Sequence, residues 1–311
     1  MKRFLKICLL TGGILYCLNL CLDVYVSERF QHKTDRKYVG WNDIIHSQLN
    51  AEVVIMGSSR AWVHYSPFII DSILHTNSYN LGIDGSNLNR QIIKYNVFDH
   101  YQKVKPKYLI VNIDYVKSLG WTIGYEREQF FPYMLNSYTR QQIRKVEPFS
   151  FMELYIPLYR YTTYKGVFSI MKEASSDGME LYKGYKGLER IWDGEAYNEM
   201  KTFHFSPNEE TLKMFDEFLY ARYIEGIQII FCFSPIYSGL TQKVDNMQEV
   251  YDTYQILANK YEIPILDYNY IDICSDSTYF YNATHLTKQG SEIFSTKLAH
   301  DIDSLGLFKL Q

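Results

Sequence analysis

Residues 53–61 read VVIMGSSRA, an apolar run that enters a glycine turn followed by two serines. Continuous apolarity, without polar residues at alternate positions, indicates a strand covered on both faces, as in a parallel sheet between helices. A strand that passes through a tight turn into a helix leaves the turn residues at the carboxyl edge of the sheet, where α/β proteins bind ligands. This pattern predicts the first strand of an α/β domain over 52–56, with Ser59 exposed at the functional edge.

Four more apolar runs and four helical patterns follow along the chain. The predicted strands cover 78–81, 108–114, 227–234 and 263–268. The predicted helices cover 87–101, with Ser86 as N-cap, and 211–225, 244–261 and 288–304. Strands that alternate with helices predict a three-layer α/β/α sandwich around a five-stranded parallel sheet, of the flavodoxin-like type.

The alternation of strands and helices breaks once, over 117–205, directly after the third predicted strand. This insertion is rich in aromatic residues, Phe130, Phe131 and Trp192 among them. Its position at a strand-to-helix connection favours a cap that shapes a substrate cleft, with aromatic rings as platforms for stacking sugars. The alternative is that these rings only pack against each other and against the body of the domain.

The N-terminus has the pattern of a membrane anchor. Lys2, Arg3 and Lys6 form a basic head, and residues 7–22 are uncharged and mostly apolar. A helix over these residues spans about 24 Å, and the flanking residues extend it to the roughly 30 Å hydrocarbon core of a bilayer. The alternative, a cleaved signal peptide, lacks a small-residue cleavage site after Leu22.

We therefore expect three regions along the chain. Residues 1–27 form a cytoplasmic basic head and a single transmembrane anchor, 28–50 form a linker, and 51–311 form one extracytoplasmic domain that includes the insertion. Lys and Arg number 32 against 35 Asp and Glu, a net charge of −3, which argues against nucleic acid as a partner. Three of the five cysteines lie in the anchor, and no Cys or His cluster has metal-ligand spacing, so neither a metal nor another cofactor is expected.

Polar residues follow the other predicted strands at the same edge of the sheet. The segment 79–86 (YNLGIDGS) contains glycines that allow a backbone N–H to approach a ligand, and Asn112 and Asp114 end the third strand. The segment 280–287 (FYNATHLT) precedes the last helix. Its His285 has the chemistry of a general base for Ser59.

These segments resemble, in order and spacing, the blocks of the SGNH (GDSL-type) hydrolase superfamily over about 51–305, apart from the insertion. The resemblance implies that Ser59 is the nucleophile and that the amides of Ser59 and Gly85 form the oxyanion hole. It matches the Asp-x-x-His block to Asn282 and His285, with asparagine in place of the acid. The block Gly-x-Asn-Asp expected after the third strand is missing, which removes one donor from the oxyanion hole.

An α/β-hydrolase is the alternative family, because residues 57–61 nearly fit its G-x-S-x-G turn. In that fold several strands precede the nucleophile and the acid lies well before the histidine. Here Ser59 follows the first strand, and the position of the acid is three residues before His285. The order of the residues therefore favours the SGNH type.

The replacement of the acid by Asn282 leaves open how His285 is supported. Asp267 or Asp276 could supply a carboxylate, or Asn282 could accept the imidazole N–H without providing charge, as in Cys-His-Asn sites. His64 is expected to be a packed or surface residue.

Arg60, next to the predicted nucleophile, has two interpretations. It could bind an anionic substrate, or it could form a salt bridge with Asp84 or Asp114.

The resemblance implies an extracytoplasmic serine esterase or O-acyltransferase at the bacterial cytoplasmic membrane, similar to proteins that handle acyl groups in alginate O-acetylation and teichoic acid D-alanylation. The implied substrate is an acylated cell-envelope polysaccharide or another ester, and the implied partner is a multispanning membrane acyltransferase. The alternative is a catalytically weakened or inactive binding or scaffold subunit of an envelope-polysaccharide assembly, in which Asn282 marks lost chemistry.

Overall fold

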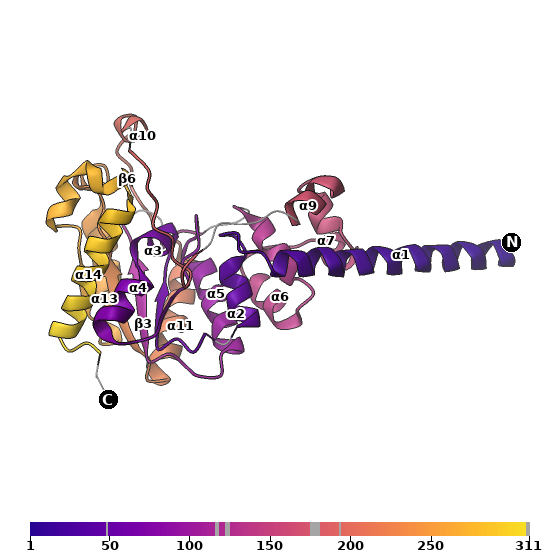
Figure 1. Ribbon diagram of the computed structural model, residues 1–311, viewed down its shortest axis with the longest axis horizontal. Helices are drawn as coiled ribbons and strands as arrows, with labels where there is room; N and C mark the ends of the chain where they lie inside the picture. The colour runs from indigo at the N-terminus through magenta and orange to yellow at the C-terminus, as the bar shows by residue number, and fades with distance from the viewer. Residues whose placement is uncertain (48, 116–117, 122–124, 175–180, 193, 309–311) are drawn as a thin grey trace. The chain divides into compact units, whose positions relative to one another are not determined.

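A computed structural model describes the chain except residues 48, 116–117, 122–124, 175–180, 193 and 309–311 (Figure 1). The chain divides into two compact units. Unit 1 comprises Met1–Asp43 and Ile123–Glu180, and unit 2 comprises Ile44–Thr122 and Leu181–Gln311. The predicted insertion, 117–205, is thus divided between the units, because only its residues 123–180 belong to unit 1.

Unit 2 is built on a parallel sheet of five short strands, all close to their predicted positions. They are β1 (Val53–Met56), β2 (Ser78–Asn80), β3 (Tyr108–Ile113), β4 (Gln228–Phe233) and β5 (Ile265–Asp267). Their order is β2-β1-β3-β4-β5, and each neighbouring pair is parallel. This is the flavodoxin-like order of a doubly wound sheet, and it confirms the predicted fold class.

Helices cover both faces of this sheet. Its strands are continuously apolar because both of their faces are buried. On one face, Ile55 of β1 and Ile110 of β3 belong to a core cluster with Phe294 and Leu298 of α14 (Lys288–Ser304). The same face carries α3 (Ser59–His64) and α4 (Pro67–Leu74), which contact α14.

On the opposite face, Phe231 of β4 stacks on Phe215 of α11 (Glu209–Ile224), with ring centroids 5.7 Å apart. The helices α5 (Leu88–Tyr101) and α13 (Met247–Lys260) complete this layer. The three-layer sandwich is therefore formed, and α5 and α14 lie where the sequence predicts them. The N-cap of α5 is Asn87 rather than Ser86, because the Ser86 hydroxyl donates to the carbonyl of Ile83 (2.9 Å) in the preceding turn.

Short elements complete unit 2 around the carboxyl edge of the sheet. They are α10 (Glu195–Asn198), α12 (Ser238–Thr241), the 3₁₀ helices η2 (Asp272–Ser275) and η3 (Ser277–Tyr279), and the antiparallel strands β6 (Phe280–Asn282) and β7 (His285–Leu286). The sequence does not predict the β6–β7 hairpin. The hairpin places Asn282 opposite His285.

Unit 1 is helical and is organised around the first helix, α1 (Lys2–Gln31). The other helices are η1 (Arg127–Tyr133), α6 (Ser137–Ile143), α7 (Phe151–Tyr155), α8 (Tyr159–Thr162) and α9 (Val167–Ala174). The helix α2 (Val39–His46) lies in the range 28–50, for which the sequence predicts a linker. In α1, residues 2–21 are exposed, whereas Asp23, Val26, Ser27 and Phe30 are buried in unit 1.

The helix α1 is long and apolar enough to cross a membrane, with a mean hydropathy of 1.9 over its most apolar window. It continues without interruption into unit 1, where the Asp23 carboxylate binds both terminal nitrogens of Arg160. The sequence alone suggests that Asp23 lies at the lipid interface. The structure instead buries Asp23 in an ion pair, because Arg160 and the Leu158 N–H (2.8 Å) satisfy its oxygens.

Candidate active site

The turn after β1 presents Ser59 rather than Ser58. Ser58 is the N-cap of α3, and its hydroxyl accepts a hydrogen bond from the N–H of Arg60 (3.4 Å). Ser59 is the first residue of the helix. Gly57 is required between strand and helix, because an added Cβ would lie 2.6 Å from the Cβ of Ala61 and 2.8 Å from that of Asn112. Close packing of the turn on β3 therefore fixes the direction in which Ser59 emerges.

Ser59 and His285 are brought together although they are 226 positions apart in the sequence. The distance from Ser59 Oγ to His285 Nε2 is 2.7 Å, within hydrogen-bond range. Ser59 comes from the end of β1, and His285 from the hairpin that precedes α14. The pair therefore has the geometry of a hydroxyl nucleophile and its general base.

Asn282 supports the other side of the imidazole and determines its tautomer. Asn282 Oδ1 accepts from the backbone N–H of Thr284 (3.0 Å) and from its hydroxyl (3.1 Å), and lies 2.9 Å from His285 Nδ1. Only the amide oxygen can accept from these donors, so the Asn282 side chain is oriented by the Thr284 backbone. His285 consequently carries its proton on Nδ1 and offers the lone pair of Nε2 to Ser59.

The two aspartates that could have replaced the missing acid lie elsewhere. Asp267 accepts from the backbone N–H of Asn269 (2.9 Å) and the hydroxyl of Tyr115 (3.0 Å). Asp276 accepts from the backbone N–H of Thr278 (2.9 Å), at the start of η3. Asn282 therefore occupies the position of the acid beside His285 Nδ1, from which the Thr284 hydroxyl is also 2.9 Å away.

The surroundings of His285 disfavour its protonation. Burial lowers the pKa of His285 to about 3, and the positive charge of Arg60 adds to the decrease, while Asp114 opposes it. A carboxylate at position 282 would stabilise the imidazolium, but an amide carries no charge. His285 is therefore neutral at physiological pH and can accept a proton, but its surroundings stabilise the resulting imidazolium poorly.

Arg60 is a buried cation next to this pair. Its terminal nitrogen donates to the carbonyl of Ser234, and its Nε has no hydrogen-bond partner among the described residues. The predicted salt bridge with Asp84 or Asp114 is not formed in the described part of the chain, because the guanidinium turns toward the end of β4. Arg60 therefore acts on His285 as a positive charge that no carboxylate compensates by a direct ion pair.

His64 has a role that the sequence does not reveal. Its Nδ1 lies 2.9 Å from Ser234 Oγ, and its Nε2 accepts the backbone N–H of Leu286 (3.0 Å), the residue after His285. Burial holds the pKa of His64 well below its usual range, so the ring is neutral and donates from Nδ1. His64 is a positioning residue that joins the helix carrying Ser59 to the strand carrying His285. The only signal in the sequence is its position five residues after Ser59.

The glycine segment after β2 is held against α3 by Asn80. The Asn80 amide nitrogen donates to the carbonyls of Ala61 (2.7 Å) and Tyr65 (3.0 Å), and its oxygen accepts the N–H of Gly82 (2.9 Å). A Cβ at Gly82 would lie 2.4 Å from the backbone nitrogen of Trp62, so only glycine fits there. Gly85 lies in the exposed turn that follows, at φ +62°, a conformation that favours glycine.

The residues at the end of β3 have hydrogen-bond partners other than Ser59 and His285. Asn112 is buried, and its Oδ1 accepts the hydroxyl of Tyr65 (2.8 Å). Asp114 accepts the backbone N–H of Ser118 (3.1 Å). Among the described contacts of Asn112 and Asp114, none is with Ser59, so neither replaces the oxyanion donor of the missing third block.

Aromatic side chains, of which Trp192 comes from the second part of the insertion, lie around the His285 hairpin. Tyr281 stacks on the imidazole of His285 (centroids 5.3 Å apart, planes at 12°), and Arg190 lies over the Tyr281 ring at 5.6 Å. The rings of Trp192 and Tyr237 meet edge to face at 4.8 Å, and the Tyr237 N–H donates to the carbonyl of Ala283 (3.0 Å). These rings therefore contact the hairpin that carries His285 and Asn282.

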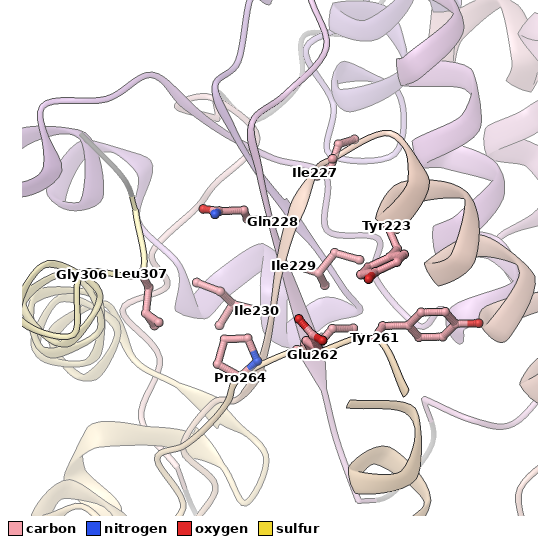
Figure 2. Close-up of a pocket in the computed structure, with 12 residues that line it drawn as sticks. Tyr223, Ile227, Gln228, Ile229, Ile230, Tyr261, Glu262, Pro264, Gly306 and Leu307 are labelled. Carbon is pink, nitrogen blue, oxygen red and sulfur yellow. The ribbon is translucent and has the colours of Figure 1, made fainter. Parts of the chain in front are cut away.

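A cavity of about 410 Å³ lies at the opposite edge of the sheet (Figure 2). It is lined by residues at the amino ends of β4 and β5, including Gln228, Ile229 and Pro264 (Figure 2). Ligands of doubly wound sheets bind at the carboxyl ends of the strands. The cavity is therefore separate from the Ser59–His285 pair. Among the described residues, no group of three His, Cys, Asp or Glu side chains could hold a metal ion.

Comparisons with known proteins give likenesses in structure alone. No model of a known protein family matches the chain. No curated protein matches it.

Solved structures that are similar to the chain include the following three. One is a candidate acylhydrolase from Bacteroides fragilis, at 12% identity, covering 82% of this chain and 88% of that chain with a TM-score of 0.41. Another is a candidate lipolytic protein of the G-D-S-L family from Desulfitobacterium hafniense, at 11% identity, covering 80% of this chain and 97% of that chain with a TM-score of 0.39. The third is a GDSL-like lipase from Bacteroides thetaiotaomicron, at 11% identity, covering 82% of this chain and 89% of that chain with a TM-score of 0.39. Only the residues of this chain bear on its chemistry.

The arrangement of unit 2 itself is what the sequence resemblance implies. Ser59 follows β1 directly, His285 lies just before the last helix, and both meet at the carboxyl edge of a β2-β1-β3-β4-β5 sheet. This strand order and placement agree with the α/β fold that the resemblance to SGNH/GDSL-type hydrolases implies.

Proposed function

We propose that this protein is a membrane-anchored, extracytoplasmic serine esterase or O-acyltransferase that acts through an acyl-enzyme. The observation that carries the proposal is the 2.7 Å contact between Ser59 Oγ and His285 Nε2, with Nδ1 held by the Asn282 oxygen. A hydroxyl paired with an oriented neutral imidazole is the arrangement needed to attack an ester carbonyl.

The proposed reaction has two half-steps. In the first, Ser59 Oγ bonds to the carbonyl carbon while His285 Nε2 takes its proton, and the backbone N–H groups of Ser59 and Gly85 stabilise the oxyanion. The tetrahedral intermediate then expels the alcohol, which receives the proton from Nε2. In the second, water or a sugar hydroxyl gives its proton to Nε2 and attacks the acyl carbon. The new tetrahedral intermediate expels Ser59 Oγ, which receives the proton back from Nε2, and the acid or the new ester is released.

Two features support a substrate and location in the cell envelope. The exposed apolar part of α1 would span the bacterial cytoplasmic membrane, and its continuation into unit 1 as one helix favours an uncleaved anchor. Trp192 and Tyr237 near the His285 hairpin offer aromatic faces of the kind that stack on sugar rings. We propose an acylated envelope polysaccharide as substrate and a multispanning membrane acyltransferase as the partner that supplies or receives the acyl group.

The low pKa of His285 predicts an unusual pH dependence. A histidine with an ordinary pKa of 6.5 would leave about one-thirtieth of the base neutral at pH 5. Because burial and Arg60 lower the pKa of His285 to about 3, kcat/KM for p-nitrophenyl acetate should change less than about twofold between pH 8 and pH 5. An acid limb near pH 6.5 in the wild-type enzyme would contradict this account.

Asn282→Asp is the matched variant for this measurement. A carboxylate 2.9 Å from Nδ1 would stabilise the imidazolium and raise the pKa of His285, so the acid limb should move to higher pH, which rates measured down to pH 3 would show. Turnover at pH 8 should rise roughly tenfold, the equivalent of one pKa unit. Turnover that is unchanged or lower, with an unshifted limb, would show that Asn282 does not limit the site.

The alternative function is a non-catalytic binding or scaffold subunit of an envelope-polysaccharide assembly. It is favoured by the uncharged Asn282 and by the uncompensated Arg60 cation, both of which weaken a proton-accepting histidine. A fluorophosphonate probe, which phosphonylates activated serines with loss of fluoride, separates the two functions when it is applied to the full chain in detergent. Covalent labelling supports the enzyme, and a folded chain that never labels supports the scaffold.

A further inference from the structure

Unit 1 exposes an uncharged aromatic and aliphatic face on α7. Phe151, Met152, Tyr155 and Ile156 are 71%, 47%, 51% and 40% exposed. The rings of Phe151 and Tyr155 lie 4.8 Å apart, so these side chains form one continuous patch, which we call the α7 face. Exposed apolar patches of this kind mark sites of contact with a membrane or with another protein.

The single charged residue near this patch is turned inward. Between residues 148 and 158 the only charge is Glu153, which is buried. Its carboxylate binds Arg127 (2.6 and 3.2 Å) and caps the start of α7 through the backbone N–H of Ser150 (2.8 Å). The outward side of α7 therefore carries no charge that water would have to solvate.

The α7 face lies beside the apolar half of α1. The hydroxyl of Tyr16 donates to the backbone carbonyl of Tyr155 (3.1 Å), and Figure 1 shows α7 next to α1. Tyr16 is seven residues before Asp23, or about 10 Å along the helix axis. A helix that crosses the membrane through its exposed residues thus brings the α7 face to within about 10 Å of the level where those residues leave the bilayer.

From this arrangement we infer that the α7 face inserts into the outer interfacial zone of the bilayer that α1 crosses. The occupant is lipid, at the boundary between headgroups and acyl chains, where aromatic rings are favoured and apolar faces bury roughly 5–10 Å deep. The inference rests on the anchoring part of the proposed function. Unit 1 would then contact the membrane through both α1 and α7, instead of being attached to it through α1 only.

Quenching of tryptophan fluorescence by brominated lipids tests this inference with the full chain in phosphatidylcholine vesicles. In the Phe151→Trp variant, the added emission should be blue-shifted and lost with lipids brominated in the upper acyl chain, and it should resist aqueous iodide. The matched control is Phe68→Trp, since Phe68 is also exposed (66%) but lies on α4 of unit 2. Its added emission should respond to iodide and not to brominated lipid.

Several results would overturn the inference. Emission of the Phe151→Trp variant that iodide quenches and lipid does not would place the α7 face in water, and protection from both would indicate a protein partner. Equal lipid quenching of the Phe68→Trp control would show that contact with lipid is not specific to the α7 face. Alkaline extraction tests the membrane anchor separately from the α7 face. A chain that stays in the vesicles supports α1 as an anchor whatever the quenching shows, and a chain that is released contradicts both the anchor and the insertion of the α7 face.

Discussion

Ser59→Ala should abolish hydrolysis of p-nitrophenyl acetate and labelling by fluorophosphonate. Removing the nucleophile of a serine triad costs as much as removing the whole triad, so we expect a loss of at least about 10³-fold in kcat. The physical reason is that His285 Nε2 then has no hydroxyl to deprotonate, and no acyl-enzyme can form. Steady-state hydrolysis by the purified full chain in detergent measures the effect.

Ser58→Ala is the control for this variant because Ser58 is adjacent but has a different role. Its hydroxyl caps α3 through the N–H of Arg60, so alanine should cost about 1 kcal/mol of stability and leave turnover within a few-fold of wild type. The assignment of the nucleophile would be wrong if Ser58→Ala removed labelling while Ser59→Ala kept it.

Asp23→Ala should destabilise unit 1 by about 3–5 kcal/mol, the usual effect of removing one partner of a buried ion pair. Asp23 and Arg160 are both almost fully buried, and the carboxylate also accepts the N–H of Leu158 (2.8 Å). Alanine leaves the Arg160 guanidinium buried without its counter-charge. Hydrogen exchange of the full chain in detergent should show faster exchange of the amides of η1 and α8.

Two comparisons make this result specific. Asp23→Leu combined with Arg160→Met should restore much of the stability, because apolar side chains of similar size leave no buried charge unpaired. Asp216→Ala breaks the surface pair with Lys260 (2.7 Å) and should change stability by no more than about 1 kcal/mol. Unchanged exchange in the Asp23→Ala variant would show that the ion pair does not hold α1 in unit 1.

Much of the fold can be predicted from the sequence because parallel strands are covered on both faces. Burial on both sides requires continuous apolar runs, and these place β1, β3 and β4 to within about one residue at either end. The last helix was predictable from its apolar periodicity and from Thr287, which caps it. The β6–β7 hairpin was not predictable, since its two short strands carry no periodic signal.

The candidate site could be predicted only in part. The order of the motifs and their positions at strand ends suggested that Ser59 and His285 would meet. The partner of Arg60 and the function of His64 were not predictable, because both residues contact Ser234, more than 160 positions away in the sequence. A local pattern cannot show which distant backbone group will satisfy a buried polar side chain.

The position of Ser59 after a first buried strand and of His285 before the last helix can be read along the chain, and it assigns both residues to one edge of a parallel sheet. The support of the pair depends on contacts that form only in the folded chain. The fold orients the Asn282 oxygen through the Thr284 backbone, places Arg60 against the imidazole without an ion pair, and continues the apolar helix into unit 1 through Asp23. Apolar runs act through burial, which is local in the sequence, whereas hydrogen bonds and charges act between groups that only the folded chain brings together.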